Sequence, residues 1–257
     1  MKLNANISML FQEVGFLDRF KAAANHGFKG VEFLFPYDFD KKTIQEHLEN
    51  HSLELVLFNM PPGDWENGER GMACNPKKIA EFQDSVGLAI EYATFLNCSK
   101  LHCMAGIKPL RTDTEILTET YKNNLRFAAR EAKKRDITVL IEAINFYDIP
   151  NFFLNYSTAA LNIIRDLNEP NLMFQYDVYH MQIMEGNLAN TINKNIKKIG
   201  HFQLADTPGR HEPGTGEINY TYILELIRSI EYDGWVGCEY IPKTTTKSSL
   251  AWIRPFL

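Results

Sequence analysis

Thr138-Val139-Leu140-Ile141-Glu142 is a short apolar run that ends in a carboxylate, and it belongs to a series of eight such runs along the chain. A run of this length is typical of a buried strand. The eight runs are Leu3–Ile7, Gly30–Phe33, Glu54–Phe58, Lys100–Cys103, Thr138–Glu142, Leu172–Asp177, Ile199–Leu204 and Val236–Glu239. We therefore predict eight strands.

The segments between these runs carry apolar residues at three- and four-residue spacing, which predicts helices. The clearest are Phe16–Asn25, Lys42–Asn50, Pro76–Leu96, Thr114–Arg135, Thr158–Leu167 and Tyr220–Ile230. Asn75-Pro76, Asp113 and Ser157 are suitable helix caps or first-turn residues. Strands that alternate with helices pair in parallel through right-handed crossovers.

The fold class expected from this alternation is α/β, as a (β/α)8 TIM barrel. A length of 257 residues is usual for such a barrel. The sequence has no Rossmann-type glycine fingerprint, which makes an open doubly wound sheet the weaker alternative. No linker or low-complexity run divides the sequence. We predict a single domain, 1–257, with a short C-terminal extension from Lys243 to Leu257.

Composition argues against several functional classes. A net charge of -5 disfavours a general grip on nucleic acid, which requires a basic face, and it weakly disfavours anionic membranes. No window approaches the roughly 18 consecutive apolar residues of a membrane span. The first residues turn polar too early for a secretory signal. The four cysteines form no CxxC pair, which in a chain without a signal predicts reduced thiols and a cytoplasmic location.

Polar residues lie at the ends of four consecutive predicted strands: Glu142, Asp177, Gln203 and Glu239. In a barrel the carboxyl ends of the strands converge on the axis, so these side chains are expected to meet. Crowded carboxylates require a cation or protons. An all-oxygen set favours Mg²⁺, or Mn²⁺ as an alternative, over Zn²⁺. The simpler alternative is that each residue is a solvated strand-to-loop carboxylate.

Two long connections follow predicted strands on the face where a barrel places its active site: Met60–Cys74 and Ala205–Ile218. Both are rich in turn-forming and polar residues, and we interpret them as active-site loops or lids. Arg210, in the second loop, has the planar fork that binds a carboxylate. His180 is predicted to start the loop after the sixth strand, where it either donates to a substrate oxygen or caps the next helix.

Several segments together resemble the hydroxypyruvate isomerase family, including the 2-oxo-tetronate isomerases, in the xylose-isomerase-like barrel superfamily. They are Gly30–Tyr37, Asn59 with Pro62-Gly63-Asp64, Val139–Ala143, Asp177–His180, Gln203–Ala205, Arg210–Tyr220 and Gly234–Tyr240. The resemblance runs nearly from end to end, and the Arg210-His211-Glu212-Pro213 segment is specific. Related sugar epimerases carry a histidine where Gln203 stands, which favours the isomerase branch.

The resemblance implies the roles of the site residues. Glu142, Asp177, Gln203 and Glu239 would ligate a divalent metal, with Glu142 and Glu239 also catalytic. His180 and Arg210 would lie beside the substrate. His102, at the end of the fourth strand, is equally compatible with a substrate contact and with a histidine at the edge of the core. Glu66, in the third loop, is either near the substrate or plain surface.

The expected reaction is the isomerisation of a small sugar acid through a cis-enediol. The substrate would be hydroxypyruvate, giving tartronate semialdehyde, or 2-oxo-tetronate, giving 3-oxo-tetronate. The alternative is a ketose 2- or 3-epimerase acting on a neutral sugar with the same glutamates. A DNA endonuclease on this barrel would require a histidine-rich zinc cluster and a basic cleft, and a metal-free binding barrel would be insensitive to chelation. We expect the chain to form a homo-oligomer.

Overall fold

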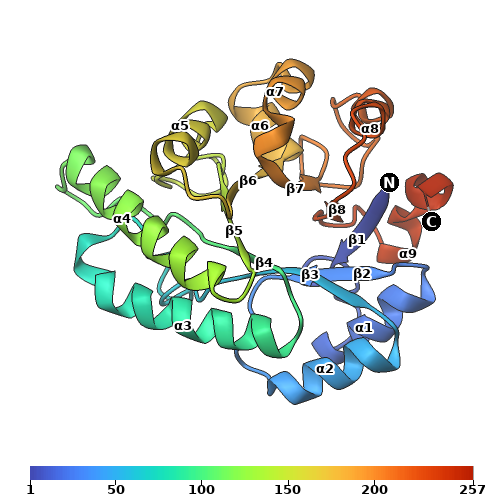
Figure 1. The fold of residues 1–257 in the computed structure, drawn as a ribbon. Helices are drawn as coiled ribbons and strands as arrows, with labels where there is room; N and C mark the ends of the chain where they lie inside the picture. Colours follow the sequence, from blue (N-terminus) through green and yellow to red (C-terminus); the bar gives the residue numbers. More distant parts are fainter. Residues whose placement is uncertain (257) are drawn as a thin grey trace. The chain divides into compact units, whose positions relative to one another are not determined.

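The computed structural model describes residues 1–256, and the side chains of residues 1–253. Over that range the strands follow one another in a closed parallel barrel in the order β1 to β8, which confirms the predicted TIM barrel (Figure 1). The strands are β1 Lys2–Asn6, β2 Gly30–Phe33, β3 Glu54–Asn59, β4 Lys100–His102, β5 Thr138–Glu142, β6 Leu172–Asp177, β7 Ile199–Leu204 and β8 Trp235–Cys238.

The helices are α1 Phe16–Asn25, α2 Lys41–Asn50, α3 Ile79–Phe95, α4 Thr114–Lys133, α5 Ser157–Leu167, α6 Val178–Met184, α7 Leu188–Asn195, α8 Tyr220–Ser229 and α9 Thr246–Ser249, with 3-10 turns η1 Pro76–Lys78, η2 Ile196–Lys198 and η3 Ala251–Phe256. Six of these helices, α1 to α5 and α8, lie on the segments whose periodicity predicted them, whereas α6, α7 and α9 were not predicted. Helix α4 shows most clearly why such a segment forms a helix. Its N-cap Asp113 accepts from Glu115 N, and one apolar face is buried.

Several local predictions were wrong, among them the bounds of β1, β3 and β4, which differ by one residue at one or both ends. His180 does not start a loop, because β6 runs directly into α6 and His180 is its third residue. Ser157 is the first residue of α5 rather than its cap, which is Tyr156. Strand β8 ends at Cys238, so Glu239 directly follows the strand. The long connections after β3 and β7 were predicted correctly.

The chain divides into two compact units, one made of residues 1–56 and 176–257 and the other of residues 57–175. In the first unit, β8 pairs with both β1 and β7, and β1 pairs with β2. Register matters here: Gly237 in β8 lies opposite Asn4 in β1 and opposite Gln203 in β7. The first unit therefore gathers polar side chains from neighbouring strands at one level.

In the second unit, β4 pairs with β3 on one side and with β5 on the other. Strand β5 pairs with β6, and Glu142 lies opposite Gln175 in that register. Helices α3 and α4 run side by side outside these strands (Figure 1). Because Gln175 precedes Asp177 by two residues on β6, the β5–β6 pairing brings the ends of these two strands to one edge of the sheet.

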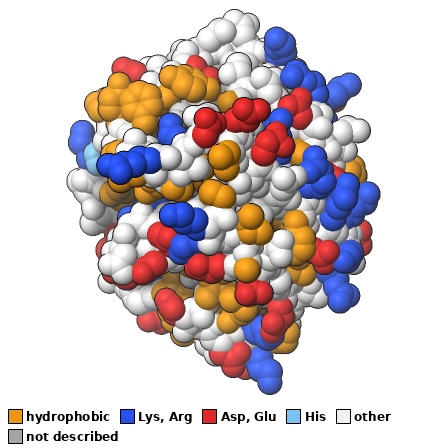
Figure 2. Space-filling view, turned by 90° about the vertical axis from the view of Figure 1, so that its left-hand side faces the viewer, with side chains coloured by type: hydrophobic (Ala, Val, Ile, Leu, Met, Phe, Trp, Pro, Cys, Tyr) orange, Lys and Arg blue, Asp and Glu red, His pale blue; other side chains and the backbone are white. Residues whose placement is uncertain are grey.

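Acidic and basic side chains are interspersed over the face drawn in Figure 2, with hydrophobic side chains among them. Interspersed charge of this kind is an ordinary solvated surface. Among the described helices, none has both the length and the apolar character needed to cross a membrane.

Candidate active site

Arg210 joins two of the predicted carboxylates in the first unit. Its Nη2 lies 2.8 Å from Glu239 Oε2 and 3.5 Å from Asp177 Oδ2. Both carboxylates are buried, with Asp177 only 1% exposed and Glu239 5%. A guanidinium stays protonated at any physiological pH, so it supplies a fixed positive charge between them. The structure thus places Arg210 against the two carboxylates that the sequence analysis assigned to a metal.

The loop that carries Arg210 is held by one buried carboxylate that the sequence analysis missed. Asp206 Oδ2 accepts from the backbone N–H groups of Gly214 and Gly216, and its Oδ1 accepts from those of Thr207 and Ile218. Asp206 is fully buried at the end of β7. Backbone N–H donors converging on a carboxylate form a strong anchor. The loop conformation that presents Arg210 follows from this anchor.

Asp177 contacts Tyr179, His180 and Arg210 in the first unit. Its Oδ1 accepts from Tyr179 N at 2.8 Å, which caps α6. Its Oδ2 lies 3.6 Å from His180 Nε2 and faces Arg210. His180 is 2% exposed, so it is an interior side chain rather than a rim residue. The unpredicted helix α6 is what turns His180 back toward the end of its own strand.

Gln203 lies in β7 with its amide turned toward a residue that the sequence analysis assigned no role. Gln203 Nε2 donates to Glu32 Oε1 at 2.8 Å. Asn6 Nδ2 donates both to Glu32 and to Glu239 Oε1. A chain of hydrogen bonds therefore runs from Gln203 through Glu32 and Asn6 to Glu239. The sequence signal for Glu32 was a charged residue inside an apolar strand.

In the second unit, Glu142 ends β5 and is 5% exposed. Its Oε2 lies 3.5 Å from Nε2 of His102, the last residue of β4. The other ring nitrogen of His102 lies 3.2 Å from Asn59 Oδ1, at the end of β3. The structure therefore places His102 beside a predicted catalytic residue, whereas Glu66 is on the exposed surface of its loop.

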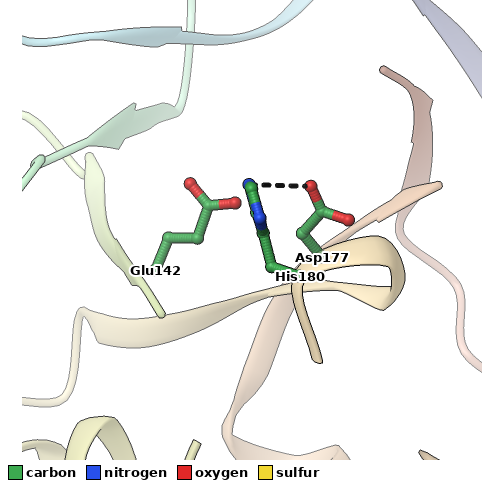
Figure 3. A group of neighbouring side chains, drawn as sticks. All are labelled: Glu142, Asp177 and His180. Atoms are coloured by element: carbon green, nitrogen blue, oxygen red, sulfur yellow. Dashed lines mark ion pairs between the residues drawn. The ribbon is translucent and has the colours of Figure 1, made fainter. Parts of the chain in front are cut away.

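Glu142, Asp177 and His180 each offer one ligand atom, and these atoms all lie within 4.8 Å of one another (Figure 3). All three side chains are buried. Two buried carboxylates beside an imidazole fit a divalent cation, because a cation offsets the cost of burying both charges. Two of the four predicted ligands are in this group, and His180 joins them although it was predicted as a substrate contact.

Burial raises the pKa of Glu239 to about 8, and the negative charges of Asp177 and Glu32 act in the same direction, while Arg210 opposes the shift. Glu32 behaves differently. Burial would raise its pKa, but the His201 imidazole and the amides of Gln203 and Asn4 hold it below the ordinary value. Glu32 is therefore held as a carboxylate, whereas the surroundings of Glu239 disfavour its charged form.

Residues 20–256 match the family model described as "Xylose isomerase-like TIM barrel". The chain is 50% identical to "Hydroxypyruvate isomerase" of Escherichia coli (strain K12), covering 100% of this chain and 99% of that one. It is 45% identical to "2-oxo-tetronate isomerase" of Cupriavidus necator, covering 98% and 97% respectively.

A solved structure described as "AP endonuclease, family 2" from Brucella melitensis superposes with a TM-score of 0.97 at 46% identity, covering 100% of this chain and 99% of that one. The two curated relatives from Escherichia coli and Cupriavidus necator are isomerases by name, and they match this chain over nearly their full length at 50% and 45% identity. The chain therefore belongs to the xylose isomerase-like TIM barrel family, and within it to the hydroxypyruvate isomerase-like isomerases.

Proposed function

We propose that this chain is a divalent-metal-dependent isomerase of a small sugar acid, which moves a carbonyl between adjacent carbons through a cis-enediol. The substrate is hydroxypyruvate, giving tartronate semialdehyde, or 2-oxo-tetronate, giving 3-oxo-tetronate. The observation that carries the proposal is the pair of buried glutamates, Glu142 and Glu239, each beside a basic side chain at the end of a barrel strand. The names of the relatives support the substrate class.

Glu142, Asp177, Gln203 and Glu239 would hold the metal, with Mg²⁺ as the first choice and Mn²⁺ as the alternative. The nitrogen of His180 within the buried group keeps Mn²⁺ in consideration. When bound, the cation stabilises the negative charge that develops on the enediolate oxygens.

The two glutamates perform the proton transfers. One takes a proton from the hydroxyl-bearing carbon, and a proton is returned to the neighbouring carbonyl carbon, while the hydroxyl proton passes to the other oxygen. Glu239 suits this role because it is buried directly after a barrel strand and lies 2.8 Å from the Arg210 guanidinium. His102 and His180, each within 3.6 Å of a site carboxylate, would donate to the substrate oxygens.

Arg210 binds the substrate carboxylate. Its side chain is 18% exposed and its guanidinium lies 5.2 Å from the centre of the Tyr179 ring. A substrate carboxylate would add a third anion to a guanidinium that already faces Asp177 and Glu239. Binding of this third anion is easier with a metal present, because the cation would neutralise part of the negative charge of Asp177 and Glu239.

The alternative is a ketose 2- or 3-epimerase acting on a neutral sugar. It needs the same proton transfer but gives Arg210 no substrate anion to bind.

A DNA endonuclease on this barrel would require a histidine-rich cluster. The part of the chain with described side chains holds one group of metal-ligand type, and only one of its three members is a histidine. A cytoplasmic location agrees with four buried free cysteines. A homo-oligomeric state is part of the proposal and is tested by sedimentation.

The test follows isomerisation of hydroxypyruvate and 2-oxo-tetronate by the chelator-treated protein, before and after Mg²⁺ or Mn²⁺ is added, with Glu142→Gln alongside. We expect activity to return with metal in the wild type and to stay absent in the variant. The ratio of kcat/KM for the two acids identifies the preferred substrate. Full activity after verified removal of the metal would refute the metal dependence. Activity on a neutral ketose but on neither acid would favour the epimerase.

A further inference from the structure

A charged side chain sits inside the strand array of the first unit, away from solvent. Glu32 is the third residue of β2 and is 1% exposed. Its strand neighbours Val31 and Phe33 are apolar and also buried. An unpaired carboxylate at such a position would be strongly destabilising, so its partners account for its presence.

Four donors converge on the Glu32 carboxylate. Oε2 receives Asn4 Nδ2 at 2.8 Å and His201 Nε2 at 2.7 Å. Oε1 receives Gln203 Nε2 at 2.8 Å and Asn6 Nδ2 at 3.3 Å. The donors come from β1 and β7, on residues that are themselves buried. Each oxygen therefore has two donors, which is the geometry of a satisfied buried anion.

A carboxylate can only accept hydrogen bonds, so it determines which way a neighbouring amide faces. The nitrogen of Gln203 must point at Glu32, and its oxygen is then turned away from Glu32. Asn6 is fixed at both ends, because its Oδ1 accepts from Ser8 N at 3.0 Å while its Nδ2 bridges Glu32 and Glu239. One carboxylate thus orients the amide of Gln203 and, through Asn6, one oxygen of Glu239.

The surrounding backbone is shaped to admit this carboxylate. Gly237 in β8 lies opposite Asn4 and Gln203 in the neighbouring strands. A Cβ atom at position 237 would stand 2.6 Å from both carboxylate oxygens of Glu32. Since Cβ atoms do not approach this closely, a glycine is required at this level. The space beside β8 is therefore reserved for the Glu32 carboxylate rather than for an apolar side chain.

We propose that Glu32 is a positioning residue, which presents the oxygen of Gln203 rather than its nitrogen to the divalent cation and fixes the Glu239 carboxylate through Asn6. This inference rests on the proposed function, because it assigns to Gln203 the role of a metal ligand. A merely structural role would affect folding but not the affinity for metal. Partners that orient metal ligands typically change that affinity by about 10- to 100-fold when they are removed.

The test is the Kd for Mn²⁺ without substrate, measured by titration calorimetry or by the electron paramagnetic resonance signal of free Mn²⁺, with the melting temperature recorded for each variant. We compare wild type, Glu32→Ala, Gln203→Ala and the double variant. We expect each single variant to bind Mn²⁺ about tenfold more weakly. If Glu32 acts through Gln203, the loss in the double variant is smaller than the product of the two single losses.

Glu32→Gln keeps the side-chain volume, and it tests the positioning role of Glu32 if Glu32→Ala does not fold. Its amide cannot accept from all four donors, so we expect an intermediate loss of affinity. Glu13→Gln is the matched control. Glu13 accepts from Thr246 N and Oγ1, outside the site, so this change should lower the melting temperature and leave the Mn²⁺ affinity unchanged.

The outcomes separate the two proposals. If the wild type binds Mn²⁺ and the Glu32 variants fold with the wild-type Kd, the positioning role is refuted and the proposed function stands. Independent, multiplicative losses in the double variant also refute it. If the wild type shows no saturable Mn²⁺ binding, both the metal-dependent function and the role of Glu32 are refuted.

Discussion

The two units hold their predicted catalytic glutamates in different ways. In the first unit, Glu239 lies 2.8 Å from the permanent cation Arg210 and is bonded to Asn6, within a network of buried charges. In the second, Glu142 lies 3.5 Å from His102, a partner that is charged only when protonated. The difference indicates unequal roles: Glu239 faces a permanent cation, whereas Glu142 faces an imidazole.

The largest expected effect is a loss of kcat when either glutamate is replaced. Glu142→Gln and Glu239→Gln should each lower kcat by about 10²- to 10⁴-fold, because each removes a group that exchanges protons with substrate. The surroundings of Glu239 raise its pKa to about 8 and so disfavour its charged form, and we therefore expect the neutral amide in Glu239→Gln to leave the stability unchanged or slightly higher near neutral pH. Steady-state kinetics and thermal unfolding measure the two effects. Near-normal kcat in both variants would rule out the two-glutamate mechanism.

The second prediction concerns the cation of the first unit. Arg210→Lys should raise KM for hydroxypyruvate by about 10- to 100-fold, because a lysine cannot form the planar, two-point bond to a carboxylate. The KM for a neutral ketose should change much less. Measured on the same preparation, an equal increase for the acid and the neutral sugar would contradict carboxylate binding by Arg210.

The third prediction tests whether the charge of Asp206 anchors the loop that carries Arg210. Asp206→Asn replaces one accepting oxygen by a donor that faces two backbone N–H groups. The expected cost is about 3 kcal/mol, with a rise in KM for the acid substrate as Arg210 loses its place. Asp113→Asn, at the exposed N-cap of α4, is the control and should cost less than about 1 kcal/mol. Equal shifts in melting temperature for both would contradict the anchor.

Much of the fold was predictable, because each strand is an apolar run bounded by polar residues. Strands β2, β5, β6 and β7 have the predicted bounds. Helix α6 was missed because its seven residues are too few for a periodic pattern, and Asp177 at its N-cap was taken only as a metal ligand. This omission is why His180 was expected in a loop.

The site was predictable in part, since a carboxylate directly after an apolar strand is visible in sequence. Glu142 and Asp177 were found in this way, and the structure places both in one group with His180. Glu32 and Asp206 were missed because their roles depend on partners 169 and 8–12 residues away, respectively, which only the strand register and the loop conformation bring close. The assignment of Glu142, Asp177, Gln203 and Glu239 to the metal stays a prediction.

The smallest expected effect concerns the second unit, where a close backbone contact helps to hold the long loop after β3. Gly71 has a φ of +104° and donates to Pro62 O at 2.8 Å, and a Cβ there would overlap the carbonyl of Met104. Gly68, in the same loop, has a φ of +93° but open space around its Cβ position. Both alanine variants bear the strain of a positive φ, about 1 kcal/mol. Only Gly71→Ala adds the overlap, worth about 1–2 kcal/mol more. Chemical denaturation of the matched pair measures this excess. Equal stabilities would show that the loop can move away from Met104 without cost, and that this backbone contact does not hold it.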